Sequence, residues 1–181
     1  EVLPNTVLQG VLAEAMEIAG PPEFTKEDHD FAREIAKTFP PGQSEAHMKD
    51  ETLTEEMKEK LAGKILNDAV LGRLPEAADS RGSTDVGDVS WCVPTEQFTT
   101  ACTALGTPGH SWQYTAQTGM HIGHAGMIAA ARTLVQAGLR LMTDPETLDK
   151  AKAEFNKRLG GKRYVSPLAP DMKPPFHQFS K

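Results

Sequence analysis

Two glycine-rich turns, with one strand-like run between them, constrain the fold of this chain more than any other feature. The first turn, residues 82–90, reads Gly-Ser-Thr-Asp-Val-Gly-Asp-Val-Ser, and the second, residues 106–112, reads Gly-Thr-Pro-Gly-His-Ser-Trp. The run between them, residues 98–105, is rich in strand-forming residues and carries no charge on either face. Such a pattern is typical of a strand that is covered on both sides. Enzymes with α/β sheets present reactive side chains on turns at strand ends, so we expect these turns to carry the chemistry.

The hydrophobic pattern predicts helices around these turns. Apolar residues recur at intervals of three and four over residues 6–19 and 120–142, which indicates one buried helical face in each. Asn5 is a suitable N-cap for the first helix, and Thr25 with Asp28 three residues later predicts the start of another. In the longer helix the expected inward residues are Ile122, Met127, Ala130, Leu134, Ala137 and Leu141.

Other segments complete a predicted α/β fold with helices packed on a small mixed sheet. Residues 54–62 predict a short charged helix with Met57 and Leu61 inward, whereas residues 43–53 predict a surface loop. Residues 86–93 are the second strand candidate. Asp144 followed by Pro145 predicts the start of a last helix, which ends near residue 160.

Composition indicates a soluble globular domain. The chain has 181 residues, of which 39% are hydrophobic and 24% charged, which is enough for one domain with a core. A net charge of -6 without a basic cluster argues against nucleic-acid binding. Neither a long apolar run nor a signal-peptide pattern is visible, so no membrane partner is expected. Cys92 and Cys102 are expected to be buried free thiols, which is compatible with the cytoplasm.

The candidate chemistry is concentrated in the two turns. His110 follows the strand-like run, where an imidazole could bind a metal such as zinc, or could simply hydrogen-bond to the loop backbone. Asp85 and Asp88 could reach into a site, or could cap their own turn. Ser83 and Thr84 could hold a substrate carboxylate or orient Asp85.

Two further histidines and two tryptophans lie near these turns. His121 and His124 are three residues apart and would share a helical face, but we expect them to begin the helix, with His124 facing a cleft or a partner. Trp91 and Trp112 flank the motifs and are expected to fill the core.

Three motifs carry a family resemblance: residues 83–90, residues 106–112, and Ile-Gly-His-Ala-Gly-Met at 122–127. Together they resemble the C-terminal portion of the zinc-dependent aminoacylase and exopeptidase (amidohydrolase) family, and within it the p-aminobenzoyl-glutamate hydrolase subunits. The likeness extends to residues 2–5, 20–25, 144–146 and 166–168, so it covers nearly the whole chain.

The resemblance implies a fold and a domain arrangement. Residues 1–161 would be the C-terminal part of a mixed-sheet zinc-exopeptidase catalytic domain, and residues 1–5 the return from a lid domain. The sheet would be completed by a missing N-terminal half. Residues 162–181 would form an extended proline-rich tail.

The resemblance also implies a function. The complete protein would cleave an amide bond to an amino acid in an N-acyl amino acid, a dipeptide or p-aminobenzoyl-glutamate, and would use two zinc ions or other divalent metals. His110 matches the C-terminal metal-binding histidine, whereas the general base and most other ligands would come from the N-terminal half, which is therefore an expected partner. The residues matched as substrate-binding or site-supporting are Ser83, Thr84, Asp85, Asp88 and His124.

No His-x-Asp motif occurs in this chain, and its one Glu-Glu pair, residues 55–56, lies in a charged segment expected to face solvent. The alternative is therefore a non-catalytic assembly or regulatory subunit that keeps the fold and belongs to a homo- or hetero-oligomer.

Overall fold

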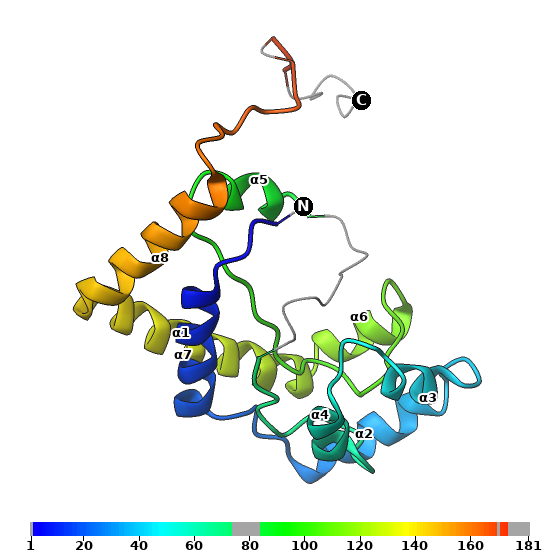
Figure 1. Cartoon of the computed structure of the whole chain (residues 1–181). Coiled ribbons are helices and arrows are strands. Elements are labelled where there is room, and N and C mark those ends of the chain that lie inside the picture. Colours follow the sequence, from blue (N-terminus) through cyan, green and yellow to red (C-terminus); the bar gives the residue numbers. More distant parts are fainter. Residues whose placement is uncertain (1, 74–83, 170, 174–181) are drawn as a thin grey trace.

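The computed structural model describes residues 2–73, 84–169 and 171–173, and these residues form helices joined by irregular segments (Figure 1). No strand occurs among them, so the prediction of an α/β fold with a mixed sheet is wrong. The helices are α1 (Thr6–Ala19), α2 (Lys26–Ala36), α3 (Gln43–Met48), α4 (Glu55–Leu61), α5 (Val86–Ser90), α6 (Trp112–Thr118), α7 (His121–Thr143) and α8 (Pro145–Leu159).

Both predicted strands have other structures. Residues 86–93 contain α5, in which the hydroxyl of Ser90 donates a 2.6 Å hydrogen bond to the carbonyl of Gly87. Residues 98–103 have no regular secondary structure and make no backbone ladder. At the end of this segment, Ala104 N–H donates to the side-chain oxygen of Gln117 at 2.7 Å, and Leu105 N–H donates to Ile65 C=O at 2.9 Å. A buried glutamine side chain and one loop carbonyl therefore accept the two backbone hydrogen bonds that a neighbouring strand would accept in a sheet.

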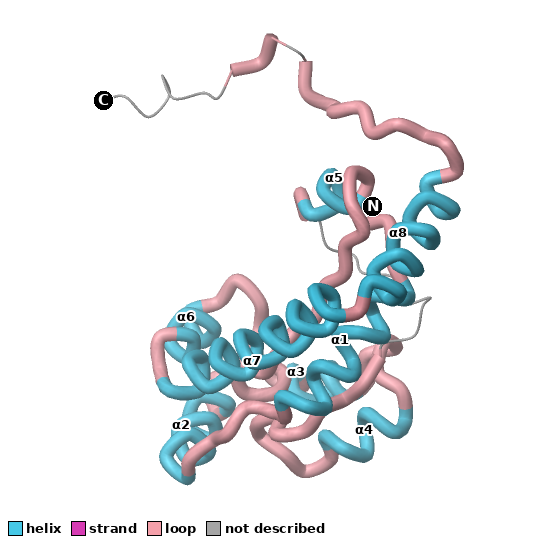
Figure 2. The backbone as a smooth tube through the Cα atoms, turned by 90° about the vertical axis from the view of Figure 1, so that its left-hand side faces the viewer, coloured by secondary structure: helices cyan, strands magenta, loops and turns pink. Residues whose placement is uncertain are grey.

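Helices α1, α7 and α8 pack together at one end of the molecule (Figure 2). Asn5 caps α1 by accepting from Leu8 N–H at 3.0 Å, and its amide also donates to the carbonyl of Ala151 in α8 at 2.9 Å. Val11 and Ala15 of α1 bury their side chains against Ala137 of α7. The predicted N-cap of the first helix is confirmed, and it also anchors α8.

A second cluster of buried residues joins α2 and α7 through the irregular segments. Its members are Ala32, Ile35, Leu66, Ala104 and Ile122, with partly buried phenylalanines packed around them. The predicted capping box is confirmed, because Thr25 and Asp28 each accept from the other's backbone N–H.

Helix α7 was predicted correctly, but the assignment of its inward face was partly wrong. Its buried residues are Ile122, Gly123, Gly126, Ala129, Thr133 and Ala137. Met127 and Leu134, both predicted to face inward, are each 58% exposed. Small side chains lie on the buried side because the chain approaches closely there: a Cβ on Gly126 would collide with Ala101 and Cys102.

Other local predictions also need correction. Residues 43–48 form α3, which begins after Gly42 with φ of 79°, where a loop was expected. Cys92 is exposed, and Trp112 is 62% exposed, so neither lies in the core. The predicted burial of Met57 and Leu61 in α4 is confirmed. Among the described helices, none is both long and apolar enough to span a bilayer.

Candidate functional site

The two glycine-rich turns lie apart in the structure. The described part of the first turn forms α5, next to the N-terminus and the end of α8, whereas the second turn leads into α6 beside the start of α7 (Figures 1 and 2). Ser83 falls outside the described residues. The two turns therefore do not form one site within the part of the chain that the structure describes.

His110 is exposed and has an unusual backbone conformation. Its φ is 54°, a left-handed value that residues other than glycine rarely adopt, although histidine adopts it more often than most. The next residue, Ser111, starts α6 by accepting from Tyr114 N–H at 3.2 Å. Among the described residues, the imidazole of His110 has no hydrogen-bond partner, and no group of three metal-binding side chains occurs. The metal-binding role of His110 stays a prediction.

The carboxylates of α5 take part in local contacts. The Thr84 hydroxyl accepts from Val86 N–H at 3.2 Å, while Asp85 occupies the N-cap position without a side-chain capping bond. Partial desolvation, together with the nearby Asp88 carboxylate, raises the pKa of Tyr164 in the segment after α8. The role of Asp88 in a catalytic site, like that of Thr84 and Asp85, stays a prediction.

A histidine–aspartate pair joins α2 to α7. Nδ1 of His121 lies 2.7 Å from Oδ2 of Asp28, whose side chain is only 6% exposed. Burial raises the pKa of Asp28, but hydrogen bonds from the Thr25 N–H, the His121 ring and the Thr25 hydroxyl outweigh it and lower the pKa. The sequence pattern singled out His121, and separately Asp28 as part of a capping box, but gave no signal that these two residues, 93 positions apart, form a pair.

His124 lies one turn further along α7 and is exposed. With His121 and Arg132 it lines a shallow hollow of about 420 Å³ between α7 and residues 22–25. The expectation that His124 begins the helix and faces an opening agrees with this position, but its link to a catalytic site stays a prediction.

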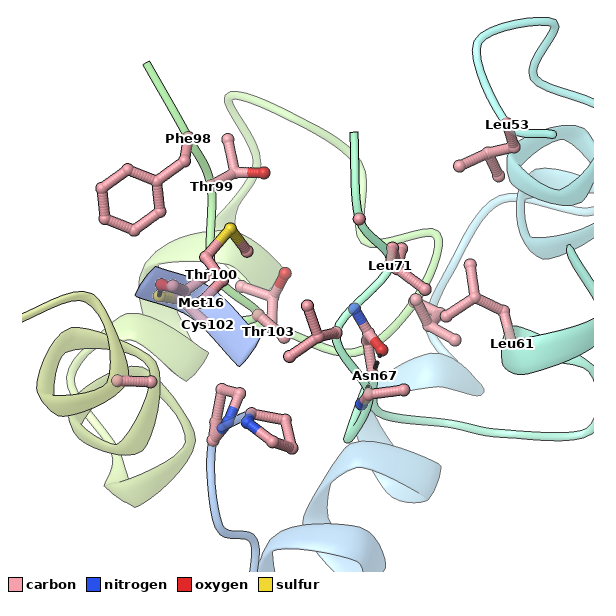
Figure 3. A pocket seen from close by; sticks show the side chains of 18 of the residues that line it. Met16, Leu53, Leu61, Asn67, Leu71, Phe98, Thr99, Thr100, Cys102 and Thr103 are labelled. Carbon is pink, nitrogen blue, oxygen red and sulfur yellow. Dashed lines mark hydrogen bonds between the residues drawn. The ribbon is translucent and has the colours of Figure 1, made fainter. Parts of the chain in front are cut away.

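A larger groove of about 750 Å³ lies between α1, α4 and two irregular segments, residues 67–73 and 96–107 (Figure 3). Its walls are mostly apolar and hydroxyl-bearing. The side chains labelled in the close-up are Met16, Leu53, Leu61, Asn67, Leu71, Phe98, Thr99, Thr100, Cys102 and Thr103. None of the described candidate site residues lines this groove, so it does not bring them together.

Comparison with known proteins finds one similar hydrolase subunit and confirms the resemblance drawn from the motifs of this chain. The relative is a p-aminobenzoyl-glutamate hydrolase subunit of Escherichia coli (strain K12), which is 30% identical over 177 residues. The match covers 95% of this chain but only 37% of the length of that curated relative. No protein-family model and no solved structure matches the chain.

Proposed function

We propose that this chain is part of a metal-dependent amidohydrolase that cleaves an amide bond to an amino acid. The observation that carries the proposal is the 30% identity, over 95% of the chain, to a protein named as a p-aminobenzoyl-glutamate hydrolase subunit. The proposed substrates are p-aminobenzoyl-glutamate, N-acyl amino acids or dipeptides. Because the match spans 37% of the relative, the activity belongs in this proposal to a longer polypeptide or assembly.

The described residues do not by themselves fit a catalytic zinc site. Such a site usually has three protein ligands and one open position, whereas the only proposed ligand here is His110, and no group of three candidate ligands occurs in the described part of the chain. We therefore derive no reaction step through a metal. In the proposal, His110 supplies one ligand, and polypeptide beyond this sequence supplies the others and the general base.

What favours His110 in this role is its presentation. It follows directly after a turn, its ring is exposed and unpartnered among the described residues, and its backbone holds a conformation that costs free energy. Such conformations persist where the surrounding structure enforces them and occur often at functional sites. A histidine that only stabilised the loop would be expected to hydrogen-bond to it.

The test measures metal content and p-aminobenzoyl-glutamate hydrolysis in the full-length protein. We expect His110→Asn to lose about one metal equivalent and at least about 100-fold in rate, in line with the loss of a ligand. Asparagine tolerates left-handed φ, so the loop should keep its shape. His29→Asn, at a helical histidine outside the proposed site, is the matched control and should keep both properties. A His110→Asn protein with full zinc content and full rate would refute the assignment.

The alternative is a non-catalytic assembly or regulatory subunit. It is favoured by the separation of the two turns in the described structure and by the word subunit in the name of the relative. If the full-length protein neither binds zinc nor hydrolyses p-aminobenzoyl-glutamate, but raises the activity of a partner subunit when mixed with it, this alternative replaces the hydrolase.

A further inference from the structure

The turn that presents His110 is held by α6, the helix that follows it. The turn starts at Ala104, which is buried in the core and 2% exposed. Gln117, in the last turn of α6, is completely buried. A glutamine is seldom buried in this way, because its amide loses contact with water and must find hydrogen-bond partners inside the protein. Most of the partners that Gln117 finds belong to the turn.

The amide of Gln117 uses both its oxygen and its nitrogen. Its oxygen accepts from Ala104 N–H at 2.7 Å, and its nitrogen donates to the Thr107 hydroxyl and to Gln113 C=O, both at 3.0 Å. The Thr107 hydroxyl in turn donates to Ala104 C=O at 2.7 Å. Rotating the amide by half a turn would set its nitrogen against an N–H and its oxygen against a carbonyl, so one orientation satisfies these groups. Gln117 therefore fixes Thr107 relative to Ala104.

The other end of the turn is closed by Ser111. Its hydroxyl donates to Pro108 C=O at 2.6 Å and accepts from Tyr114 N–H at 3.2 Å, so one side chain both closes the turn and starts α6. The ring of Pro108 fixes its own φ. One residue, Gly109, separates Pro108 from His110, whose φ is 54°. The backbone on both sides of His110 is therefore held by side chains of α6 and its N-cap.

The turn and α6 also contact the segments around α2 and α3. Gly106 has a φ of 78°, and a Cβ on it would lie 3.0 Å from Cα of Ser44, so the turn passes close to α3. Gln113 is 6% exposed, and its amide donates to Thr38 C=O at 3.1 Å, just beyond the end of α2. These contacts attach α6 and the start of the turn to the rest of the fold. The side-chain bonds from α6 then set the shape of residues 107–110.

We infer that Gln117 is a positioning residue for His110. Its amide holds Thr107, and through Thr107 the backbone that presents the His110 imidazole with a left-handed φ. Such a conformation costs free energy and persists where its surroundings enforce it. The inference rests on the proposed function, in which His110 supplies one metal ligand. Replacing groups that orient a metal ligand costs about 10–100-fold in metal affinity or rate.

The first measurement compares variants of the full-length protein in rate and in zinc affinity. We expect Gln117→Leu to lower both kcat for p-aminobenzoyl-glutamate hydrolysis and zinc affinity by about 10-fold or more, with KM nearly unchanged. Thr107→Val removes the hydroxyl that Gln117 contacts and should cause a smaller loss of the same kind; it replaces Gln117→Leu if that variant folds poorly. In a His110→Asn background neither substitution should lower zinc affinity or kcat further, because the ligand that they orient is gone.

Glu154→Gln is the matched control for a loss of stability alone. Glu154 accepts from Thr6 N–H and Val7 N–H at the start of α1, and these partners do not belong to the turn. The control should lower stability in urea denaturation while leaving kcat and zinc affinity unchanged. If Gln117→Leu and Glu154→Gln instead lower kcat in proportion to the stability that each loses, Gln117 acts only through the stability of the fold, and the inference is overturned.

The second measurement does not depend on activity. Hydrogen exchange at short labelling times reports local opening of residues 104–110 in the same proteins. We expect exchange there to be about 10-fold faster or more in Gln117→Leu, because Ala104 N–H loses its acceptor, and unchanged in Glu154→Gln. Equal exchange in Gln117→Leu and the unaltered protein would overturn the inference. Full zinc content and full rate in His110→Asn would refute the proposed function, whereas the exchange result still decides whether Gln117 holds the turn.

Discussion

Replacing Glu154 by Gln should weaken the fold more than any other single loss of charge on α8. The Glu154 carboxylate accepts from Thr6 N–H and Val7 N–H, both at 3.0 Å, from the Thr6 hydroxyl at 2.8 Å, and from Nε of Arg158 at 2.8 Å. It therefore supplies acceptors for two backbone N–H groups at the start of α1 that have no partner within that helix. Its negative charge also lies at the positive end of the helix dipole of α1.

The pKa of Glu154 sets the size of the expected change in the free energy of unfolding. Burial raises it, but the hydrogen bonds from Val7, Thr6 and Arg158 outweigh burial and lower the pKa from 4.5 to about 2. This difference corresponds to about 3 kcal/mol of stability at neutral pH. The side chain is only 15% exposed, so little of this is lost to solvent screening. Because Gln keeps one neutral acceptor, we expect Glu154→Gln to lower the free energy of unfolding by about 2–3 kcal/mol at pH 7.

The pH dependence gives a sharper test. The carboxylate has a lower pKa in the folded state than in the unfolded state, so its contribution is complete above about pH 5 and declines as the pH falls toward 2. About 2 kcal/mol of it should be gone by pH 3. Urea denaturation at pH 7, 5, 4 and 3 should therefore show the unaltered protein and Glu154→Gln converging.

The control for this series is Glu146→Gln, at a 78% exposed carboxylate on the same helix that pairs with Lys150. It should change stability by less than about 0.5 kcal/mol at every pH. If Glu154→Gln and the unaltered protein lose stability in parallel between pH 5 and pH 3, the carboxylate does not hold α1 as described.

Three further predictions concern tight or strained positions, each measured by urea denaturation at pH 7. Gly126→Ala should lower the free energy of unfolding by about 1–3 kcal/mol because its methyl group has no room, whereas Gly138→Ala should raise it by about 0.5–1 kcal/mol through helix propensity. Equal effects of the two substitutions would contradict the packing of α7. Gln117→Leu should lower the free energy of unfolding by about 1–3 kcal/mol because Ala104 N–H loses its acceptor. An unchanged free energy would show that this N–H finds another acceptor. His110→Ile should lower the free energy of unfolding by about 1–2 kcal/mol because isoleucine is strained at a φ of 54°, whereas His110→Gly should stay within about 1 kcal/mol of the unaltered protein. An Ile variant as stable as the unaltered protein would argue against the left-handed backbone.

Local chemistry made part of the fold predictable. Asn5, Thr25 and Asp144 each occupy the N-cap position that their sequence context predicted, because a cap depends only on a side chain and an N–H three residues away. The left-handed Gly160 ends α8 for a similarly local reason. Predictions of this kind need no knowledge of the rest of the molecule.

Long-range relations were not predictable from the same patterns. Residues 98–105 have the composition of a covered strand, but a strand also needs a ladder partner, and none of the described residues provides one. Likewise, the periodicity of α7 identified a helix but not which of its two apolar faces the chain covers. For the candidate site, the motifs identified His110 and Asp88, but the distance between their two turns depends on packing that neither motif specifies.

The bonds that join the start of α1 to α8 also affect how the protein can be made. Asn5 and Thr6 find their partners in Ala151 and Glu154, 146 and 148 residues later. At the usual speed of translation, a ribosome needs on the order of 10 s to reach those partners after the first helix has emerged. Until then α1 lacks its anchor, so α1 and α8 can complete their packing only after the residues between them have left the ribosome.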